Sequence, residues 1–366
     1  MKLTVTQNNL AKAISLVSRV ASARPGLPIL ADVLLQTSEG MLTIAGSNFE
    51  VAITSTIHAQ VDEAGAIAVP AKLLSDFVGN LPHTNVNLET DGNKLKVSAA
   101  GFRSTINSNA AEEYPALPEP ATENDIVLPT DKLKKSISGT VIATSNDTTR
   151  PILTGADFYA VNGEAFLAAT DGYRLAESKI MDAKDDFSMI IPAKTLTDII
   201  PLLNGTKEIT VRYNDEQVSF TAGETCLTSR LIDGRFIDYK RLLPGDTNFQ
   251  IKVNRTELIK ITKMAQLFAR VTSGTVVITG NPAEKTLEVR SIVSQLGNNS
   301  SSIDAEFLAA KGDEDCIVNL NSKYLLDALN CLDGDSVIIK FNGKMTPVLL
   351  LGEGDDYKHM VMPVKA

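Results

Sequence analysis

Alternating and helical patterns of hydrophobic residues follow one another in a fixed order along the chain. Residues 2–6 alternate between apolar and polar, a polar break follows, and residues 8–20 then have apolar positions at helical spacing. The same order recurs at 125–144 and at 249–270. Alternation is typical of a half-buried strand, and a polar break before a helical pattern is typical of a capped helix. The patterns therefore predict a strand followed by a helix in three places.

A second kind of helical segment is also written three times, at 69–82, 191–204 and 320–333. Each copy has a lysine, a leucine two residues later, an aspartate after another two and a second leucine five residues further on. These residues are Lys72, Leu74, Asp76 and Leu81; Lys194, Leu196, Asp198 and Leu203; and Lys323, Leu325, Asp327 and Leu332. The first helices align as well, through Leu10, Leu133 and Leu258 and through Lys12, Lys135 and Lys260. Identities at fixed offsets indicate an internal repeat.

Strand-like stretches with turn signals fill the space between these helices. In the first repeat they span 29–36, 41–46 and 51–61, and three more follow residue 85, with the hairpin signal Asp91–Gly92. Each repeat thus predicts two strand–helix–three-strand units, which together make an α+β domain. Proline-rich segments at 114–124 and 241–248 are typical of linkers. We expect three tandem domains of similar fold, at 1–121, 122–245 and 246–366.

A tandem array of sheets leaves unpaired strand edges at its two ends, and such edges promote association. One solution is a head-to-tail contact between two chains that closes the array into a ring. The sequence pattern is compatible with this arrangement.

Charge is distributed unevenly over the predicted elements. The chain has 366 residues and a net charge of −9, which alone argues against a general nucleic-acid binder. The first helix of each repeat nevertheless has more basic than acidic residues. Helices tolerate lysine and arginine well, which is the simpler explanation for any single one. A common basic surface on these helices would instead bind an anionic polymer, while an acidic exterior would not.

Sequence motifs for catalysis are missing from the chain. The three histidines lie in different predicted units, and the sequence contains no CxxC, HExxH, GxSxG or GxGxxG motif. We therefore expect no enzymatic activity, no metal and no cofactor, although an enzyme with a dispersed site stays an alternative. No apolar run approaches the roughly 18 residues that span a bilayer. With no export signal at the N-terminus, the chain is expected to be cytoplasmic and its three cysteines reduced.

Four motifs resemble those of a known family. They are "RPGLPIL" at 24–30, "ATDGYRLAES" at 169–178, "LIDGRFIDYKRLLP" at 231–244 and "VMPVK" at 361–365. In order and spacing the chain is similar, from end to end, to the β subunits of bacterial DNA polymerase III, the sliding clamps. The resemblance implies a head-to-tail homodimer of three-domain chains, closed around duplex DNA with helices lining the hole. It also implies a processivity factor that tethers the replicative polymerase and is placed on DNA by a clamp loader.

The resemblance implies three sets of functional residues. Basic residues of the inner helices would contact DNA without reading its sequence: Lys12, Arg19, Arg24, Lys72, Lys135, Lys194, Lys260, Lys263 and Lys323. A groove between the second and third domains would bind partner peptides with leucine and phenylalanine anchors: Arg150, Leu153, Thr170, Gly172, Tyr173, Arg174, Leu175, Ile237, Arg241, Leu242, Asn321, Tyr324, Pro347, Met360, Met362 and Val364. The dimer contact would join Arg103 and Ile106 to Val271 and Thr272 of a second chain.

The dimer contact departs from the pattern of the family. The stretch "SIVSQLGNNSSSIDAEF" lacks the acidic cluster that often faces the basic edge of the partner. We therefore expect the contact to depend on strand pairing and apolar burial, with a modest dependence on salt. The alternative to a ring is a monomeric repeat scaffold that binds protein peptides without encircling DNA. Oligomeric state separates these two hypotheses.

Overall fold

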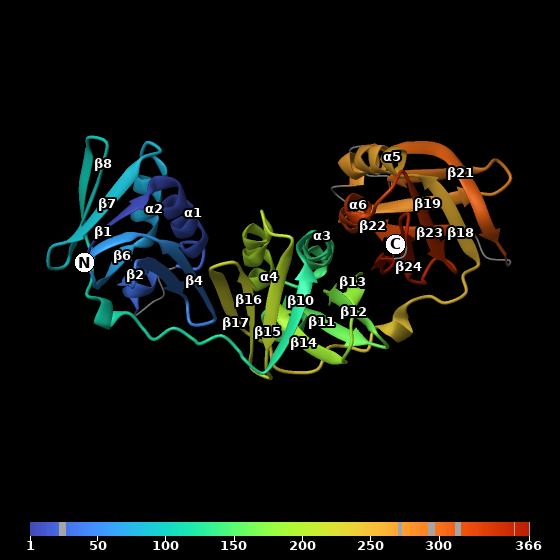
Figure 1. Ribbon diagram of the computed structural model, residues 1–366. Coiled ribbons are helices and arrows are strands. Elements are labelled where there is room, and N and C mark those ends of the chain that lie inside the picture. The colour runs from blue at the N-terminus through green and yellow to red at the C-terminus, as the bar shows by residue number, and fades with distance from the viewer. Residues whose placement is uncertain (22–26, 270–272, 292–296, 312–315, 355, 366) are drawn as a thin grey trace. The chain divides into compact units, whose positions relative to one another are not determined.

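The computed structural model describes residues 1–21, 27–269, 273–291, 297–311, 316–354 and 356–365. Figure 1 shows the chain coloured from its N-terminus to its C-terminus. It folds into two compact units. The first unit comprises Met1–Asp131 and Lys194–Leu231, and the second comprises Lys132–Ala193 and Ile232–Ala366. The central repeat of the sequence therefore contributes one part of its chain to each unit.

The N-terminal repeat contains two helices and nine strands within the described residues. In chain order they are β1 (Lys2–Thr6), α1 (Gln7–Val17), β2 (Asp32–Ser38), β3 (Met41–Ser47), β4 (Val51–His58), β5 (Gln60–Glu63), β6 (Ala66–Pro70), α2 (Ala71–Gly79), β7 (Asn85–Thr90), β8 (Lys94–Ala99) and β9 (Phe102–Asn107). This confirms the predicted strand–helix–three-strand order, apart from the additional short strand β5. Residues 29–31, which we expected to begin a strand, belong instead to a 3₁₀ turn that spans Pro28–Ala31.

The central and C-terminal repeats follow the same order. The central one has β10 (Asn124–Pro129), α3 (Thr130–Thr140), β11 (Gly155–Val161), β12 (Glu164–Thr170), β13 (Arg174–Asp182), β14 (Phe187–Pro192), α4 (Ala193–Ile199), β15 (Glu208–Tyr213), β16 (Gln217–Ala222) and β17 (Thr225–Arg230). The C-terminal one has β18 (Phe249–Asn254), α5 (Arg255–Phe268), β19 (Thr275–Asn281), β20 (Thr286–Ser291), β21 (Ser300–Ala310), β22 (Ile317–Asn321), α6 (Ser322–Cys331), β23 (Ser336–Phe341), β24 (Val348–Leu351) and β25 (Tyr357–Val361).

Antiparallel strand pairing joins neighbouring repeats inside each unit. In the first unit the sheet orders are β5-β1-β7-β8-β9 and β10-β15-β16-β17-β4-β3-β2-β6, so β17 of the central repeat pairs with β4. In the second unit one sheet has the order β14-β11-β12-β13-β25-β24-β23-β18-β21-β20-β19-β22. There β13 of the central repeat pairs with β25, the last strand of the chain. The two junctions are built from equivalent strands.

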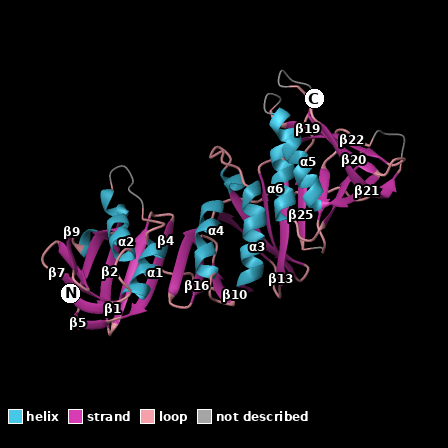
Figure 2. Ribbon diagram, turned by 90° about the horizontal axis from the view of Figure 1, so that it is seen from above, coloured by secondary structure: helices cyan, strands magenta, loops and turns pink. Residues whose placement is uncertain are grey.

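The repeated residues have a structural role as well as a sequence pattern. All six leucines named in the second-helix repeat, and all three aligned in the first helices, are buried. The aligned lysines of all six helices are exposed. In the N-terminal repeat α1 packs against α2 and against β3 and β4. Figure 2 shows α1 and α2 beside each other. The leucines are therefore repeated because every copy buries the same helix face in a core.

Side-chain caps, which the polar residues before the helical patterns predicted, form at α5 and α6 but not at α1. Asn254 caps α5 with a side-chain oxygen that accepts from Glu257 N at 3.0 Å. Asn321 caps α6 in the same way, accepting from Lys323 N at 2.9 Å. Thr6 stands at the N-cap position of α1 but makes no such side-chain hydrogen bond. Two of the helices thus begin at a side-chain cap, where an otherwise unsatisfied N–H is bound.

Candidate functional site

A cavity of about 350 Å³ opens in the second unit, where three separate segments of the chain meet. Its lining residues come from the β12–β13 turn, the N-terminal end of α6 and the C-terminal tail: Tyr173, Asn321, Tyr324, Met362, Pro363, Val364 and Lys365. Five of these seven belong to the groove set that the sequence predicted. Pro363 and Lys365 were missed, although they alternate with Met362 and Val364 in the same tail.

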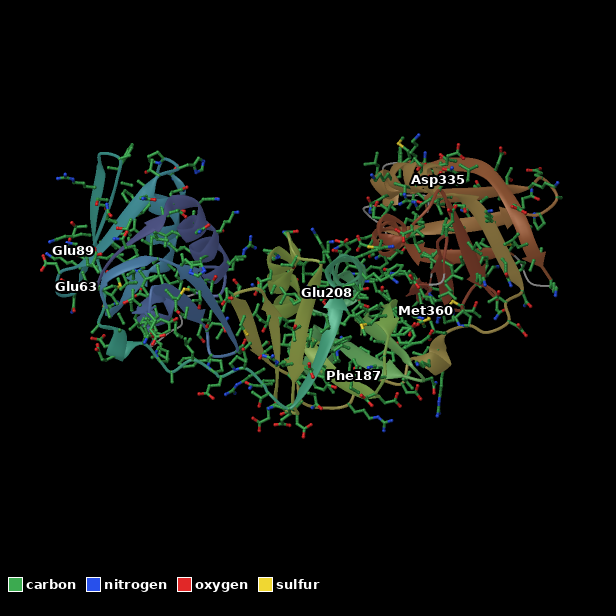
Figure 3. All side chains as sticks on the ribbon, viewed as in Figure 1. Glu63, Glu89, Phe187, Glu208, Asp335 and Met360 are labelled. Atoms are coloured by element: carbon green, nitrogen blue, oxygen red, sulfur yellow. The ribbon has the colours of Figure 1, made fainter. Side chains whose placement is uncertain are left out.

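Backbone hydrogen bonds hold the C-terminal tail across this cavity. Met362 N donates to Tyr173 O at 2.8 Å, and Val364 N donates to Asn319 O at 2.8 Å. Just before the tail, β25 pairs with β13 in a register that places Met360 opposite Leu175. Figure 3 labels Met360 on this strand. The tail thus continues the sheet and forms one wall of the cavity.

Next to the tail, a tight turn at residues 170–174 contributes a second part of the wall. Asp171 Oδ1 accepts from Tyr173 N at 2.8 Å and from Arg174 N at 3.0 Å. The Thr170 hydroxyl accepts from Gly172 N at 3.1 Å. Gly172 has φ +91°, a conformation that residues with a Cβ rarely adopt. The turn leaves Tyr173 63% exposed, so its ring is free to contact a ligand.

Arg174 lies behind the cavity wall and does not line the cavity. Its side chain is 8% exposed, and Nε donates to Asp171 at 3.1 Å while Nη1 donates to Asp327 at 2.6 Å. Nη2 donates to the carbonyl of Ile142. The guanidinium carbon lies 4.4 Å from the ring centroid of Tyr324. The sequence indicated a groove contact for Arg174, but the structure shows a buried residue that supports the turn and Tyr324.

Beneath the cavity lies an apolar cluster that also contains predicted groove residues. Leu175 and Met360 are buried in it together with Tyr159, Phe236 and Leu349, and Met362 packs against it. Leu153 is buried as well. Apart from Met362, these side chains are buried in the core and do not line the cavity, so their apolar character in the sequence reflects core packing.

The remaining predicted groove residues lie outside the lining of the cavity. Arg150 is exposed, and its Nε lies 3.1 Å from Asp147 Oδ2. Its guanidinium group also lies close to Gly172 in the turn. Ile237 and Leu242 are exposed and Arg241 pairs with Asp238 at 3.0 Å. Pro347 is half-buried just before β24. Thr170 is buried, with its hydroxyl donating to Arg174 O at 2.6 Å.

The segment that carries Ile237 and Leu242 is fixed by a buried polar cluster. Glu177 Oε2 accepts from Tyr159 Oη at 3.0 Å and from Tyr239 Oη at 2.5 Å. Burial raises the pKa of both tyrosines, and the neighbouring Glu177 carboxylate raises it further. Lys240 Nζ lies 5.0 Å from the centroid of the Tyr159 ring. Sequence patterns did not reveal this cluster, because its members come from three distant segments.

The basic residues predicted to contact DNA are all exposed where the structure describes them. Lys12 lies on α1, Lys72 on α2, Lys135 on α3, Lys194 on α4, Lys260 and Lys263 on α5 and Lys323 on α6, and Arg19 follows α1. Arg24 lies outside the described residues. Two of the lysines are ion-paired within the chain: Lys135 with Asp333, and Lys194 with Asp198 at 2.5 Å.

Several sheets in the described part of the chain end in strands that pair on one side only, and two unpaired edges bear on the predicted dimer contact. One is β9, the last strand of its sheet. The other is the first half of β21, because residues 300–304 pair only with β20 whereas β18 pairs with residues 305–310. Arg103 on β9 is exposed, but Ile106 is only 3% exposed, so its side chain belongs to the core of this chain. Phe102, at 54% exposure, is the apolar side chain on this strand that the sequence reasoning missed. Val271 and Thr272 lie outside the described residues.

Comparison with known protein families assigns the chain. Models of the DNA polymerase III beta subunit match it in three consecutive parts: the N-terminal domain at 1–118, the central domain at 127–238 and the C-terminal domain at 240–365. The chain belongs to the DNA polymerase III beta subunit family. It is therefore a DNA polymerase processivity factor with three tandem domains of the clamp fold, whose partners in general are DNA, a second copy and a polymerase.

Relatives of this beta-subunit chain match it over its whole length. The beta sliding clamp of Bacillus subtilis is 31% identical over 380 residues, covering 100% of both chains. The crystal structure of the Bacillus subtilis sliding clamp superposes with a TM-score of 0.94 at 28% identity, covering 100% of this chain and 99% of that one. A Pseudomonas aeruginosa sliding clamp solved with bound griselimycin has a TM-score of 0.93 at 25% identity, with 100% of both chains covered.

Two further observations concern cofactors and membranes. Among the residues that the structure describes, no group of three or more His, Cys, Asp and Glu side chains is arranged to hold a metal ion. No helix in the described ranges is long and apolar enough to cross a membrane.

Proposed function

We propose that two copies of this chain close head to tail into a ring around duplex DNA and that the 350 Å³ cavity binds short peptides of the proteins that the ring tethers. The observation that carries the proposal is the joining of Tyr173, Tyr324 and the Met362 tail around one opening. A clamp loader, the replicative polymerase and other proteins with leucine- and phenylalanine-containing motifs are the proposed partners. The chemistry of a tether requires no catalytic group.

The lining of the cavity suits an apolar anchor with a few polar contacts. Two tyrosines, a methionine, a proline and a valine supply apolar surface, and Asn321 and Lys365 supply polar groups at the rim. Methionine is flexible and polarizable, which allows one pocket to accept several apolar side chains. The griselimycin-bound relative supports ligand binding by clamps of this family. We propose that the remaining sequence-predicted groove residues support this surface from behind or extend it.

Sequence-independent DNA contact is the role we propose for the exposed basic residues. Lysine is a hydrated point charge on a flexible stem, which attracts phosphate without reading bases. The proposed set is Lys12, Arg19, Arg24, Lys72, Lys135, Lys194, Lys260, Lys263 and Lys323. Retention on DNA would then come from ring closure, and the lysines would attract the DNA backbone without preventing the ring from sliding along it.

Ring closure is proposed to join the free edge of β9 in one chain to the free edge of residues 300–304 in the other. Exposed Phe102 and Arg103 would accompany the backbone pairing, with Val271 and Thr272 of the partner chain near them. Serine occupies 300, 301 and 302, so this edge is largely uncharged. The match of three clamp-domain models over the chain favours this ring over a monomeric scaffold. Boundaries at 121/122 and 245/246 are the proposed domain limits.

Retention on DNA tests the ring. After loading by a compatible clamp loader, the protein should stay on a nicked circular plasmid and leave when the plasmid is linearised. Equal retention on both forms would show ordinary surface binding and contradict encirclement.

Truncation of the tail tests the cavity. Met362→Ala should weaken binding of a labelled leucine–phenylalanine peptide by about 1–3 kcal/mol, roughly five- to more than a hundredfold, because a few buried apolar contacts dominate such interfaces. Met345→Ala is the matched control, since Met345 is exposed in the second unit but does not line the cavity. Fluorescence titration measures the peptide affinity of each variant. Equal affinities of Met362→Ala and the unmodified protein would remove the tail from the site.

A further inference from the structure

The repeated aspartate of the second helices has different partners in different copies. In α4, Lys194 Nζ lies 2.5 and 2.6 Å from the two carboxylate oxygens of Asp198, four residues later in the same helix. In α6 the equivalent carboxylate, Asp327, accepts instead from Arg174 Nη1 at 2.6 Å. No ion pair of Lys323 occurs in the described part of the second unit. The two helices have the same residue spacing, but the aspartate of α4 binds a lysine of its own helix whereas the aspartate of α6 binds an arginine of a distant turn.

The reason lies in the turn that precedes β13. An equivalent turn precedes β4 in the first unit, and both make the same hydrogen bonds. Asn48 Oδ1 accepts from the backbone N–H groups two and three residues later, as Asp171 Oδ1 does. The hydroxyl before it, on Ser47, accepts from Phe49 N at 3.1 Å, matching Thr170 and Gly172.

The two turns differ in the side chain at their last position. Val51 stands in the first unit where Arg174 stands in the second. A valine cannot bind a carboxylate, and Asp198 in α4 pairs with its own lysine. Only the second unit has both the arginine at the turn and the carboxylate that binds it. The described cavity with Tyr173 and Tyr324 lies at that same junction.

Arg174 connects the turn at residues 170–174 to α6, and both elements contribute lining residues to the cavity. Its Nε is bound to Asp171 in the turn and its Nη1 to Asp327 in α6, and its guanidinium carbon lies 4.4 Å from the centroid of the Tyr324 ring. Tyr324 is three residues before Asp327, so both side chains lie on the same face of the helix. A guanidinium held at both ends restricts the Tyr324 ring through a cation–π contact.

We propose that Asp327 is a positioning residue for peptide binding: by holding Arg174, it fixes the Tyr324 ring against the cavity before a ligand arrives. This inference rests on the proposed peptide-binding role of the cavity. Asp327 is not among the residues that line the cavity, and its side chain is 29% exposed on the helix. Its effect on the ligand would therefore pass through Arg174 and Tyr324. A preorganised wall removes the cost of ordering a side chain during binding.

The test is the affinity of a labelled leucine–phenylalanine peptide for the full chain carrying Asp327→Asn. The asparagine keeps the size of the side chain but removes the charge that holds the guanidinium. Freeing one side chain at an interface corresponds to a loss of affinity of about two- to tenfold. Asp198→Asn is the matched control, because it removes the equivalent carboxylate of α4, outside the cavity. Its affinity should equal that of the unmodified protein.

A double-mutant cycle separates positioning from a general loss of structure. With Tyr324→Ala already present, adding Asp327→Asn should change the affinity less than twofold, since the ring on which Asp327 acts is gone. The same loss in both backgrounds, or unchanged affinity in Asp327→Asn alone, would overturn the proposal. An equal loss in Asp198→Asn would also overturn it, because the effect would not depend on Arg174.

Failure of the peptide-binding role itself gives a different result. If the unmodified protein does not bind the peptide, or if Met362→Ala binds it as tightly, the proposed function of the cavity fails. If the unmodified protein binds and Met362→Ala is weakened while Asp327→Asn is not, only the positioning role fails.

Discussion

A buried histidine gives a prediction about the pH dependence of stability. His359 lies on β25, fully buried, with Nδ1 2.8 Å from Tyr357 Oη. The tyrosine hydroxyl has one hydrogen and donates it to Gly139 O at 2.8 Å. His359 Nδ1 must then be the donor to Tyr357, which leaves Nε2 as the unprotonated nitrogen. That nitrogen is buried and has no hydrogen-bond partner among the described residues.

Burial, together with the smaller effect of the nearby Arg174 charge, lowers the pKa of His359 from 6.5 to about 3. Between about pH 3 and pH 6.5 the unfolded chain therefore binds a proton that the folded chain does not. Stability falls as the pH falls through this window, because ∂ΔG/∂pH is positive wherever the unfolded state holds more protons. Between about pH 7.5 and pH 5 the loss from this one group is about 2 kcal/mol, at about 1.36 kcal/mol per pH unit below an unfolded pKa near 6.5.

The contribution of His359 to the free energy of unfolding is measured by urea unfolding of the unmodified protein and of His359→Asn. Unfolding is followed by circular dichroism at about pH 7.5 and about pH 5. The asparagine amide can still donate to Tyr357 but does not titrate, so a cavity would lower its stability by the same amount at each pH. Burial raises the pKa of Asp157 to about 6, and that group acts in the opposite direction. Its contribution cancels when the two proteins are subtracted.

The expected result is that the stability difference between the two proteins changes by about 2 kcal/mol over this range. His58→Asn is the matched substitution at an exposed histidine, which removes an imidazole without disturbing the buried Tyr357–His359 pair. A constant difference for His359→Asn would show that His359 does not stay neutral in the folded protein, and the tautomer argument would be wrong.

Two further predictions concern DNA and the dimer. Replacing Lys12, Lys135 and Lys260 by alanine should leave the melting temperature nearly unchanged and lower the slope of log DNA affinity against log salt concentration by about 2. The reason is that each lysine that contacts phosphate releases roughly one counterion, and Lys135 is partly neutralised by its ion pair with Asp333. An unchanged slope in salt titrations would place these lysines away from DNA. Phe102→Asp should shift the dimer to monomer in analytical ultracentrifugation while Phe49→Asp, at an exposed phenylalanine off that edge, does not. Dissociation of the unmodified dimer should depend only modestly on salt, and a sharp loss between low and moderate salt would reveal a charged interface.

Local sequence patterns determined the repeat, its order of elements and the buried face of each helix. Leu74, Leu196 and Leu325 recur because every copy packs the same helix face, and packing of a helix face leaves a period in the sequence. The exposure of the repeated lysines follows from the same period. The cavity wall formed by Tyr173 and Met362 was also visible, but only through the resemblance of its motifs to a family.

Partners across the fold depend on tertiary structure, because nothing local distinguishes them. Asp198 and Asp327 have the same spacing from a lysine, yet one pairs within its helix and the other with Arg174, 153 residues away. Arg174 and Leu175 look like groove residues in the sequence, but both are buried where β13 pairs with β25. Ile106 looked like an interface residue, and the alternation of β9 buries it in its own core. Register and long-range pairing decide which side of a strand faces solvent, and a one-residue difference in register reverses the answer.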